Sequence, residues 1–380
     1  MKPALPRRHS MNRRDFLHRT VAAAGLGTAA ITPHALGLDG HAVGSPQHVG
    51  QNLTHGDRTP HQAPTVTLAS RLQPGMTIGL IAPASNGFED QDIEFAMDIV
   101  RSLDFKVKPG AHLFDRSGYL AGTDAARASD LNAMFKDPGV DAIFCARGGF
   151  GASKLLPLID YDAIARNPKV LLGYSDITAL HLAINAQTGL ITFHGPIATQ
   201  QFSPYTLAAF QQVLQTVPTA PIIAAPPPFA QTPGRAERAN RLKTLKPGRA
   251  TGRLIGGNLS LITHLLGTPY APNFKGAILF LEDVDEAPYR IDRMLTALWL
   301  AGVFEQIAGL VIGKFTNARV SGPSLSVEAI LRDRVAPLAI PVLQGLMIGH
   351  IDDQATVPVG AMARLDADQQ QLTVIGPYLR

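Results

Sequence analysis

A serine lies where an apolar run of the sequence gives way to a helical pattern. The run at residues 170–172 is followed by Gly173, Tyr174 and Ser175. A glycine two residues before a serine favours a sharp turn from a strand into a helix. Such a turn exposes the hydroxyl beside N–H groups that favour developing negative charge, so Ser175 is a candidate nucleophile. The simpler alternative is that Ser175 caps the helix.

A pair of glycines follows another apolar run in the same way. Residues 140–146 lead directly into the motif RGGFG at residues 147–151. Without side chains, Gly148 and Gly149 allow backbone N–H groups to approach a ligand closely and to form an anion cradle. The spacing fits neither a dinucleotide fingerprint nor a P-loop, which disfavours a phosphate site. A glycine-rich turn without a ligand is the alternative.

A glutamate and a histidine complete the set of chemically interesting positions. Glu282 directly follows the apolar residues 279–281 and could face inward, whereas Asp285 and Glu286 are interpreted as solvated. His350 follows a glycine at the end of a further apolar stretch and is placed to project from a loop. A structural histidine is one alternative. A metal site with Asp352 and Asp353 is disfavoured because no second histidine is clustered with them.

The elements that must position these residues alternate between strand and helix patterns. Such alternation is typical of a parallel sheet covered on both faces. The sequence predicts strands at residues 76–83, 105–109, 140–146 and 170–172, and helices at 90–103, 124–135, 177–186 and 205–216.

A proline-rich segment, residues 218–250, divides this region from a second one. Its prolines at 226–228 and 233 exclude a long helix, so we interpret it as an interdomain linker. Beyond it we predict strands at 276–281 and 310–313, a helix at 288–300 and an antiparallel hairpin within 361–374.

The basic residues of the chain are concentrated at its start. The formal net charge is +4, and residues 1–40 alone carry six Lys or Arg against two Asp, which also gives +4. The remainder is therefore formally neutral, which argues against nucleic-acid binding. The only cysteine is Cys145, so we expect no disulfide, no lipid anchor and no Cys-rich metal site.

The same N-terminal segment has the layout of an export signal. Arg13 and Arg14 precede a Phe-Leu pair, a weakly apolar run and a stretch of small residues. This layout is similar to a twin-arginine signal, so we predict a signal peptide at 1–40, a flexible spacer at 41–70 and a periplasmic mature protein without stable membrane insertion. An ordinary amphipathic helix is the alternative.

Taken together, the motifs resemble the serine LD-carboxypeptidases, also called muramoyltetrapeptide carboxypeptidases. The resemblance covers about residues 72–378 and rests on six segments in order: IFCARGGFGASKLLPLIDYDAI, LLGYSDITAL, FHGP, GRLIGGNLSLI, LFLEDVDEAPYRIDRML and GHIDDQATVPVG. It implies a Rossmann-like α/β N-terminal domain at 71–217 with a parallel sheet. It also implies a smaller β-rich C-terminal domain at 251–380 and an active site in the cleft between the two.

The resemblance also assigns roles to the residues singled out above. Ser175 becomes the nucleophile, His350 its general base, and Glu282 the residue that orients the histidine. For the oxyanion hole it points to the segment of Gly148 and Gly149 together with the N–H of Asp176, leaving open which glycine donates. These six positions require no metal and no cofactor.

The activity implied by the resemblance is release of the terminal D-alanine from peptidoglycan tetrapeptides, with a muropeptide as substrate and a homodimer as the assembly. Characterised members of the family largely work in the cytoplasm, whereas the signal predicts export. One alternative is an amide hydrolase of the same fold that acts on a peptide–nucleotide antibiotic of the microcin C type. Another is a non-catalytic periplasmic peptide-binding protein in which Ser175 is only a cap.

Overall fold

The computed structural model describes residues 65–87, 89–320 and 322–380. The predicted signal at 1–40 and the predicted spacer up to residue 64 lie outside the described residues. Within the described ranges, no helix combines the length and the apolarity needed to cross a membrane.

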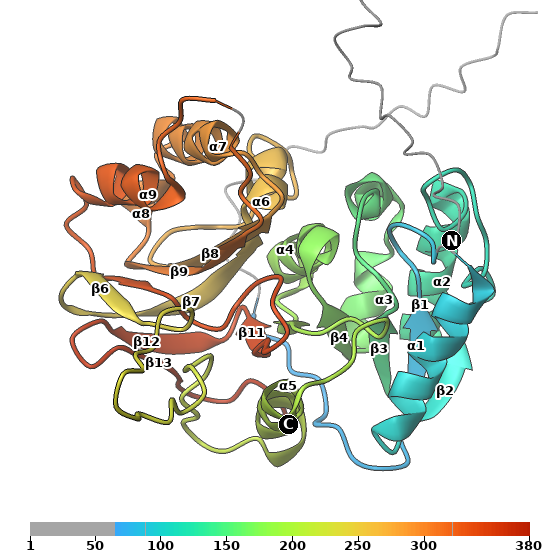
Figure 1. Cartoon of the computed structure of the whole chain (residues 1–380). Helices are drawn as coiled ribbons and strands as arrows, with labels where there is room; N and C mark the ends of the chain where they lie inside the picture. Colours follow the sequence, from blue (N-terminus) through green and yellow to red (C-terminus); the bar gives the residue numbers. More distant parts are fainter. Residues whose placement is uncertain (1–64, 88, 321) are drawn as a thin grey trace, which may run out of the picture. The chain divides into compact units, whose positions relative to one another are not determined.

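The N-terminal half provides five strands of a six-stranded sheet with the order β11-β5-β4-β3-β1-β2 (Figure 1). Its five N-terminal strands are parallel, and four of them were predicted from the sequence, β5 being the exception. Strands β3 and β4 are buried along their whole length. The strands are β1 Thr77–Ile81, β2 Lys106–Pro109, β3 Ala142–Cys145, β4 Val170–Gly173 and β5 Thr192–His194. The α-helices are α1 Asp90–Ser102, α2 Asp124–Lys136, α3 Tyr161–Arg166, α4 Thr178–Thr188 and α5 Pro204–Gln211. Short 3₁₀ segments span Ala152–Leu158 and Ser175–Ile177, and a π-helical turn, Gln212–Thr216, follows α5.

The sixth strand of this sheet comes from the far end of the chain. Strand β11, Val357–Val359, pairs antiparallel with β5 at the edge of the sheet. Pro358 fits an edge position, because a proline cannot donate a hydrogen bond to a neighbouring strand. The sequence did not predict this strand, since three residues are too few to show a pattern.

The second sheet has seven strands in the order β13-β12-β7-β8-β9-β10-β6. Strands β7 to β10 are parallel to one another, while β6, β12 and β13 are antiparallel to their neighbours. The strands are β6 Lys243–Lys246, β7 Arg249–Asn258, β8 Ile278–Val284, β9 Gly309–Thr316, β10 Val342–Gln344, β12 Met362–Asp366 and β13 Gln371–Val374. The helices are α6 Leu259–Leu265, α7 Pro288–Leu300, α8 Val303–Gln306 and α9 Val327–Val335. The predicted helix at 288–300 and the predicted hairpin are confirmed.

One predicted boundary in this sheet is wrong. The sequence placed the end of a strand at residue 281, but β8 continues through Glu282 and Asp283 to Val284. Both acidic side chains are buried, at 0% and 3% exposure. Apolar patterning misses such residues because charged side chains are almost never fully buried unless they are paired.

The two sheets share a contact next to Ser175. The backbone N–H of Asn258, at the end of β7, donates to the hydroxyl of Thr178, the first residue of α4, over 3.0 Å. The preceding Gly257 allows this approach, since a Cβ there would lie 2.8 Å from the Thr178 methyl carbon. This contact fixes the position of β7 relative to the turn that carries Ser175.

Candidate active site

Three of the predicted site residues meet in one hydrogen-bonded chain. The Ser175 hydroxyl lies 3.0 Å from Nε2 of His350, and Nδ1 of the same ring lies 2.7 Å from a carboxylate oxygen of Glu282. Because the carboxylate can only accept, Nδ1 carries the proton and Nε2 is free to accept from the serine. A general base is thereby placed on the hydroxyl and oriented from its far side.

Ser175 has an unusual backbone conformation. Its φ of 64° lies in the left-handed region, which costs a non-glycine residue about 1–2 kcal/mol. The turn is also crowded, because a Cβ at Gly173 would lie 3.1 Å from the side chains of both Cys145 and Ile177. The residue type at 173 and the strain at 175 together define a tight strand-to-helix turn with the hydroxyl at its apex.

The alternative that Ser175 caps the helix is wrong. Neither the 3₁₀ segment nor α4 has a side-chain cap. The Asp176 carboxylate instead accepts from the N–H of Ala152 over 2.7 Å, and the Thr178 hydroxyl accepts from Asn258. All three polar side chains of this turn therefore bond to distant parts of the chain.

Glu282 is the wholly buried member of the hydrogen-bonded chain. Burial raises the pKa of its carboxyl group, while the hydrogen bond from His350 lowers it. Its second oxygen has no hydrogen-bond partner among the described residues. The adjacent Asp283 has a different role, since it accepts from Asn258 and from both the N–H and the hydroxyl of Ser260. Glu282 is thus directed at the histidine, and Asp283 fixes the start of α6.

Two aromatic side chains that the sequence did not single out lie beside the site, Tyr174 against His350 and His194 against Tyr174. The Tyr174 ring lies 4.7 Å from the His350 ring, and the His194 ring lies 5.9 Å from Tyr174. Burial raises the pKa of Tyr174 to about 12 and lowers that of His194 well below its usual value, so both stay neutral at pH 7. His194 belongs to the FHGP motif, which carried the resemblance but had no assigned role.

The glycine loop lies directly against the serine turn. A Cβ at Gly148 would be 3.0 Å from the Ser175 Cβ and 3.4 Å from the backbone nitrogen of Asp176. Ser85, which the sequence analysis did not select, holds the loop on both sides of Gly149. Its N–H donates to the Gly148 carbonyl over 3.2 Å, and its hydroxyl accepts from the next N–H after Gly149 over 3.1 Å. Gly148 therefore lies beside Ser175 and the backbone nitrogen of Asp176.

The residues of the disfavoured metal site have other partners. The Asp353 carboxylate accepts from Ser203 over 2.6 Å, and the backbone carbonyl of Asp352 accepts from Thr206 over 2.9 Å. In the described part of the chain, no group of three or more His, Cys, Asp or Glu is placed to hold a metal ion. These aspartates fix the segment after His350 to the start of α5.

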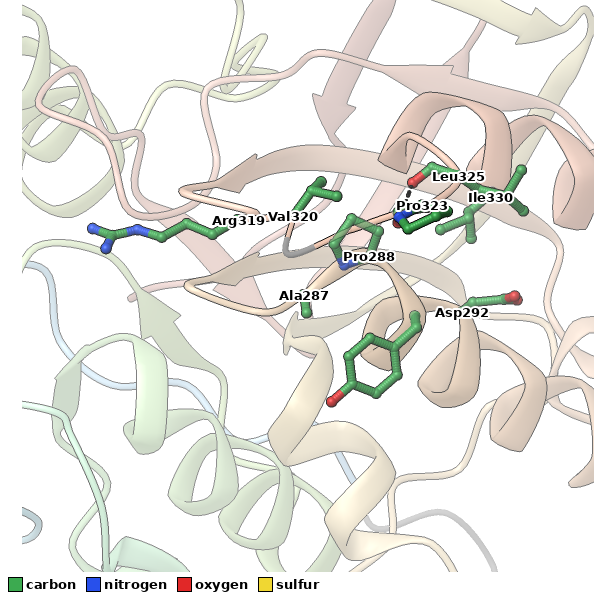
Figure 2. Close-up of a pocket in the computed structure, with 10 residues that line it drawn as sticks. Ala287, Pro288, Asp292, Arg319, Val320, Pro323, Leu325 and Ile330 are labelled. Atoms are coloured by element: carbon green, nitrogen blue, oxygen red, sulfur yellow. Dashed lines mark hydrogen bonds between the residues drawn. The ribbon is translucent and has the colours of Figure 1, made fainter. Parts of the chain in front are cut away.

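A separate hollow of about 240 Å³ lies beside the connection from β8 to α7 (Figure 2). Its lining comes from the start of α7, the segment after β9 and helix α9. The lining residues are Ala287, Pro288, Tyr289, Asp292, Arg319, Val320, Pro323, Ser324, Leu325 and Ile330. Ser175, His350 and Glu282 do not line this hollow, so it is separate from the candidate active site.

Comparison with known proteins defines the class. Residues 78–195 match the LD-carboxypeptidase N-terminal domain of peptidase family S66, and residues 251–365 match the corresponding C-terminal domain. The chain belongs to the LD-carboxypeptidase family.

The match to individual relatives extends over nearly the whole length of each relative. The probable murein peptide carboxypeptidase of Bacillus subtilis is 39% identical over 80% of this chain and 92% of its own. The crystal structure of muramoyltetrapeptide carboxypeptidase from Oxalobacter formigenes has a TM-score of 0.69 and 29% identity, over 80% of this chain and all of that one. The structure of MccF in complex with glutamyl sulfamoyl guanosine has a TM-score of 0.75 and 28% identity, over 82% and 99%. These similarities confirm the predicted α/β fold of two domains.

The strain at Ser175 leads to a stability prediction. We expect Ser175→Gly to be more stable than Ser175→Ala by about 1 kcal/mol, because glycine adopts a φ of 64° without a Cβ penalty. Both variants lose the same hydrogen bond to His350, so the comparison isolates the backbone. Urea unfolding of the two proteins measures the difference. Equal stability would show that the turn is unstrained.

His181 leads to a prediction about pH. Its Nε2–H donates to the Gly173 carbonyl over 2.8 Å, and burial lowers its pKa from 6.5 to about 4. The unfolded chain therefore binds more protons between these values, so stability is full above pH 6.5 and falls as the pH drops toward 4. Between pH 7.5 and 4.5, the wild-type protein should lose about 2–3 kcal/mol of its free energy of unfolding through His181. The variant His181→Gln should not show this part of the loss. Urea unfolding at the two pH values measures the difference. Parallel pH curves for the two proteins would contradict the assignment.

Proposed function

We propose that this protein is a serine carboxypeptidase that releases the terminal D-alanine of peptidoglycan tetrapeptides by hydrolysing an LD-peptide bond. The observation that carries the proposal is the hydrogen-bonded chain from Ser175 through His350 to Glu282, in a protein of the LD-carboxypeptidase family. The murein peptide carboxypeptidase similarity supports a muropeptide as substrate. The reaction uses only side chains and backbone amides, without a cofactor.

In the proposed first half-reaction, the Ser175 oxygen attacks the scissile carbonyl carbon while Nε2 of His350 takes its proton. Nδ1–H remains hydrogen-bonded to Glu282, whose negative charge stabilises the imidazolium. Collapse of the tetrahedral intermediate breaks the C–N bond, and the imidazolium gives its proton to the departing amine of D-alanine. An ester between Ser175 and the shortened peptide remains.

The second half-reaction releases that peptide. His350 takes a proton from a water molecule that attacks the ester, and then returns it to the serine oxygen. In both halves the negative oxygen needs N–H donors, which we assign to the loop of Gly148 and Gly149 and to Asp176. The proximity of Gly148 to Ser175 and to the Asp176 nitrogen supports this assignment. One such donor typically contributes on the order of 100- to 1,000-fold to the rate.

A second candidate is hydrolysis of a peptide–nucleotide amide. The similarity to the microcin C7 self-immunity protein MccF of Escherichia coli, 30% identical over 82% of this chain and 96% of its own, favours it. The same three side chains would serve either reaction. Only the choice of substrate separates the two candidates.

The decisive measurement is incubation with purified disaccharide-tetrapeptide, followed by mass spectrometry. We expect the loss of one alanine, in the presence or absence of EDTA. Ser175→Ala should stay folded and lose on the order of 10⁴-fold or more in turnover, whereas the exposed Ser129→Ala on α2 should retain it. Cleavage of a peptide–nucleotide instead would favour the second candidate. No cleavage of either, with no labelling of Ser175 by a fluorophosphonate probe, would favour a binding protein.

We further propose that the protein is exported to the periplasm by the twin-arginine route and acts there as a homodimer. The twin-arginine layout of residues 1–40 supports export, and the family resemblance supports the dimer, for which light scattering of the mature protein is the test. Since the route accepts folded cargo, an assembled two-domain site presents no obstacle to it.

The export proposal predicts the behaviour of a double variant. Arg13→Lys with Arg14→Lys should retain the precursor in the cytoplasm with residues 1–40 attached and with its activity intact. Cell fractionation and mass measurement of the N-terminus provide the readout. Mature-length protein in the periplasm would contradict the twin-arginine assignment, and uncleaved wild-type protein in the cytoplasm would contradict export itself.

A further inference from the structure

The proposed reaction leaves one feature of its substrate without a partner. A carboxypeptidase cuts next to a free terminal carboxylate, so its site needs a group that distinguishes this charge from an internal peptide bond. Neither the hydrogen-bonded chain of side chains nor the backbone amides near Ser175 provides a positive charge. On the basis of the proposed function, we propose that Arg147 binds the terminal carboxylate of the substrate.

Arg147 is held close to Ser175 by its backbone. It directly precedes Gly148, where a Cβ would lie 3.0 Å from the Ser175 Cβ. On its other side, the carbonyl of Ala146 accepts from the N–H and the hydroxyl of Thr199 over 3.1 and 2.9 Å. The Gly148 carbonyl is bonded to Ser85. The chain is thus fixed immediately before and after the arginine.

Its side chain is directed along the same edge of the sheet. Nη1 of Arg147 donates to the carbonyl of Asn86 over 3.2 Å, and Asn86 is itself bonded to the turn at residues 118–119. Strands β4, β3 and β1 are neighbours, and their carboxyl ends lead to Ser175, Arg147 and Asn86 in that order. Because neighbouring strands are about 4.8 Å apart, the backbone of Arg147 lies on the order of one strand spacing from that of Ser175, within the reach of an arginine side chain.

This distance suits the proposed ligand. In the substrate, three bonds separate the scissile carbonyl carbon from the terminal carboxylate carbon, a span of about 3–4 Å. Adding the contact to Ser175 on one side and a hydrogen bond to the guanidinium on the other gives about 8 Å. The carboxylate would then lie between the serine and the arginine, over the glycine loop.

Arg147 also has unused binding capacity. Neighbouring cations are paired, Arg116 with Asp90 at 2.6 Å and Lys154 with Asp124 at 3.2 Å. Arg147 is exposed and forms no ion pair with any carboxylate in the described ranges. A guanidinium has five N–H groups in a planar fork, so a single bond to Asn86 leaves the pair needed for a bidentate carboxylate contact.

The test compares two substrates that differ only in the charge at issue, a tetrapeptide with a free C-terminal carboxylate and the same peptide ending in a carboxamide. We expect the wild-type enzyme to prefer the acid by about 10- to 100-fold in kcat/KM, the usual effect of a hydrogen bond to a charged group. Arg147→Gln should reduce this ratio to near 1 by slowing cleavage of the acid only. Arg147→Lys should retain part of the preference, and the matched control Arg116→Gln should retain all of it.

Labelling of Ser175 by a fluorophosphonate, which carries no carboxylate, separates binding from damage to the site. The probe should label Ser175 of the Arg147→Gln variant at the wild-type rate. If it does not, Arg147→Lys is tested in its place. That variant must be labelled normally and must show a smaller acid-to-carboxamide ratio of kcat/KM than the wild-type enzyme. An unchanged ratio in a normally labelled variant overturns the role of Arg147 and leaves the proposed function standing. Failure of the wild-type enzyme to cleave either peptide overturns both.

Discussion

The contact between Thr178 and the end of β7 is the constraint on which the site depends. Thr178 lies three residues after Ser175, and Asn258, whose N–H it accepts, is the register partner of Glu282 across β7 and β8. One hydrogen bond of 3.0 Å therefore connects the turn that carries the serine with the strand that carries the glutamate. Gly257 makes the approach possible, because a side chain at that position would overlap Thr178. A chain of three side chains with bonds of 2.7 and 3.0 Å tolerates little movement between the two sheets.

The electrostatics of the site follow from the close contact between the two sheets. Glu282 is wholly buried, and burial of an ionised carboxylate is costly unless a hydrogen bond compensates it. The bond from His350 provides the largest compensation, which low local polarity strengthens, and the side chain of Asn258 adds to it. Tyr174 packs against His350 and His194 packs against Tyr174, and neither adds charge at pH 7. A positive charge that develops on His350 during the proposed reaction thus has Glu282 as its direct partner.

The sequence predicts those parts of the fold in which local patterns and tertiary structure agree. Strands β3 and β4 are buried on both faces and appear as continuous apolar runs, and α7 begins at a proline suited to a first helical turn. Strand β11 could not be found this way, because its three residues pair with β5 across more than 160 positions of sequence. The end of β8 was missed because its acidic residues are stabilised by partners elsewhere in the chain.

In the candidate site, too, local sequence patterns predict some features and miss those that depend on distant residues. A serine at a strand-to-helix junction usually caps the helix, so local chemistry predicts a cap. At a φ of 64°, Ser175 bonds instead to His350, which lies 175 residues away in the sequence. A strained serine and a buried glutamate with one unpartnered oxygen each depart from what local rules favour. Such departures persist only where the surrounding structure holds them, and they cluster where a ligand supplies the missing partner. The carboxyl edge of β4 holds the serine, and His350 links the glutamate to it, so both departures lie at the edge where the substrate is proposed to bind.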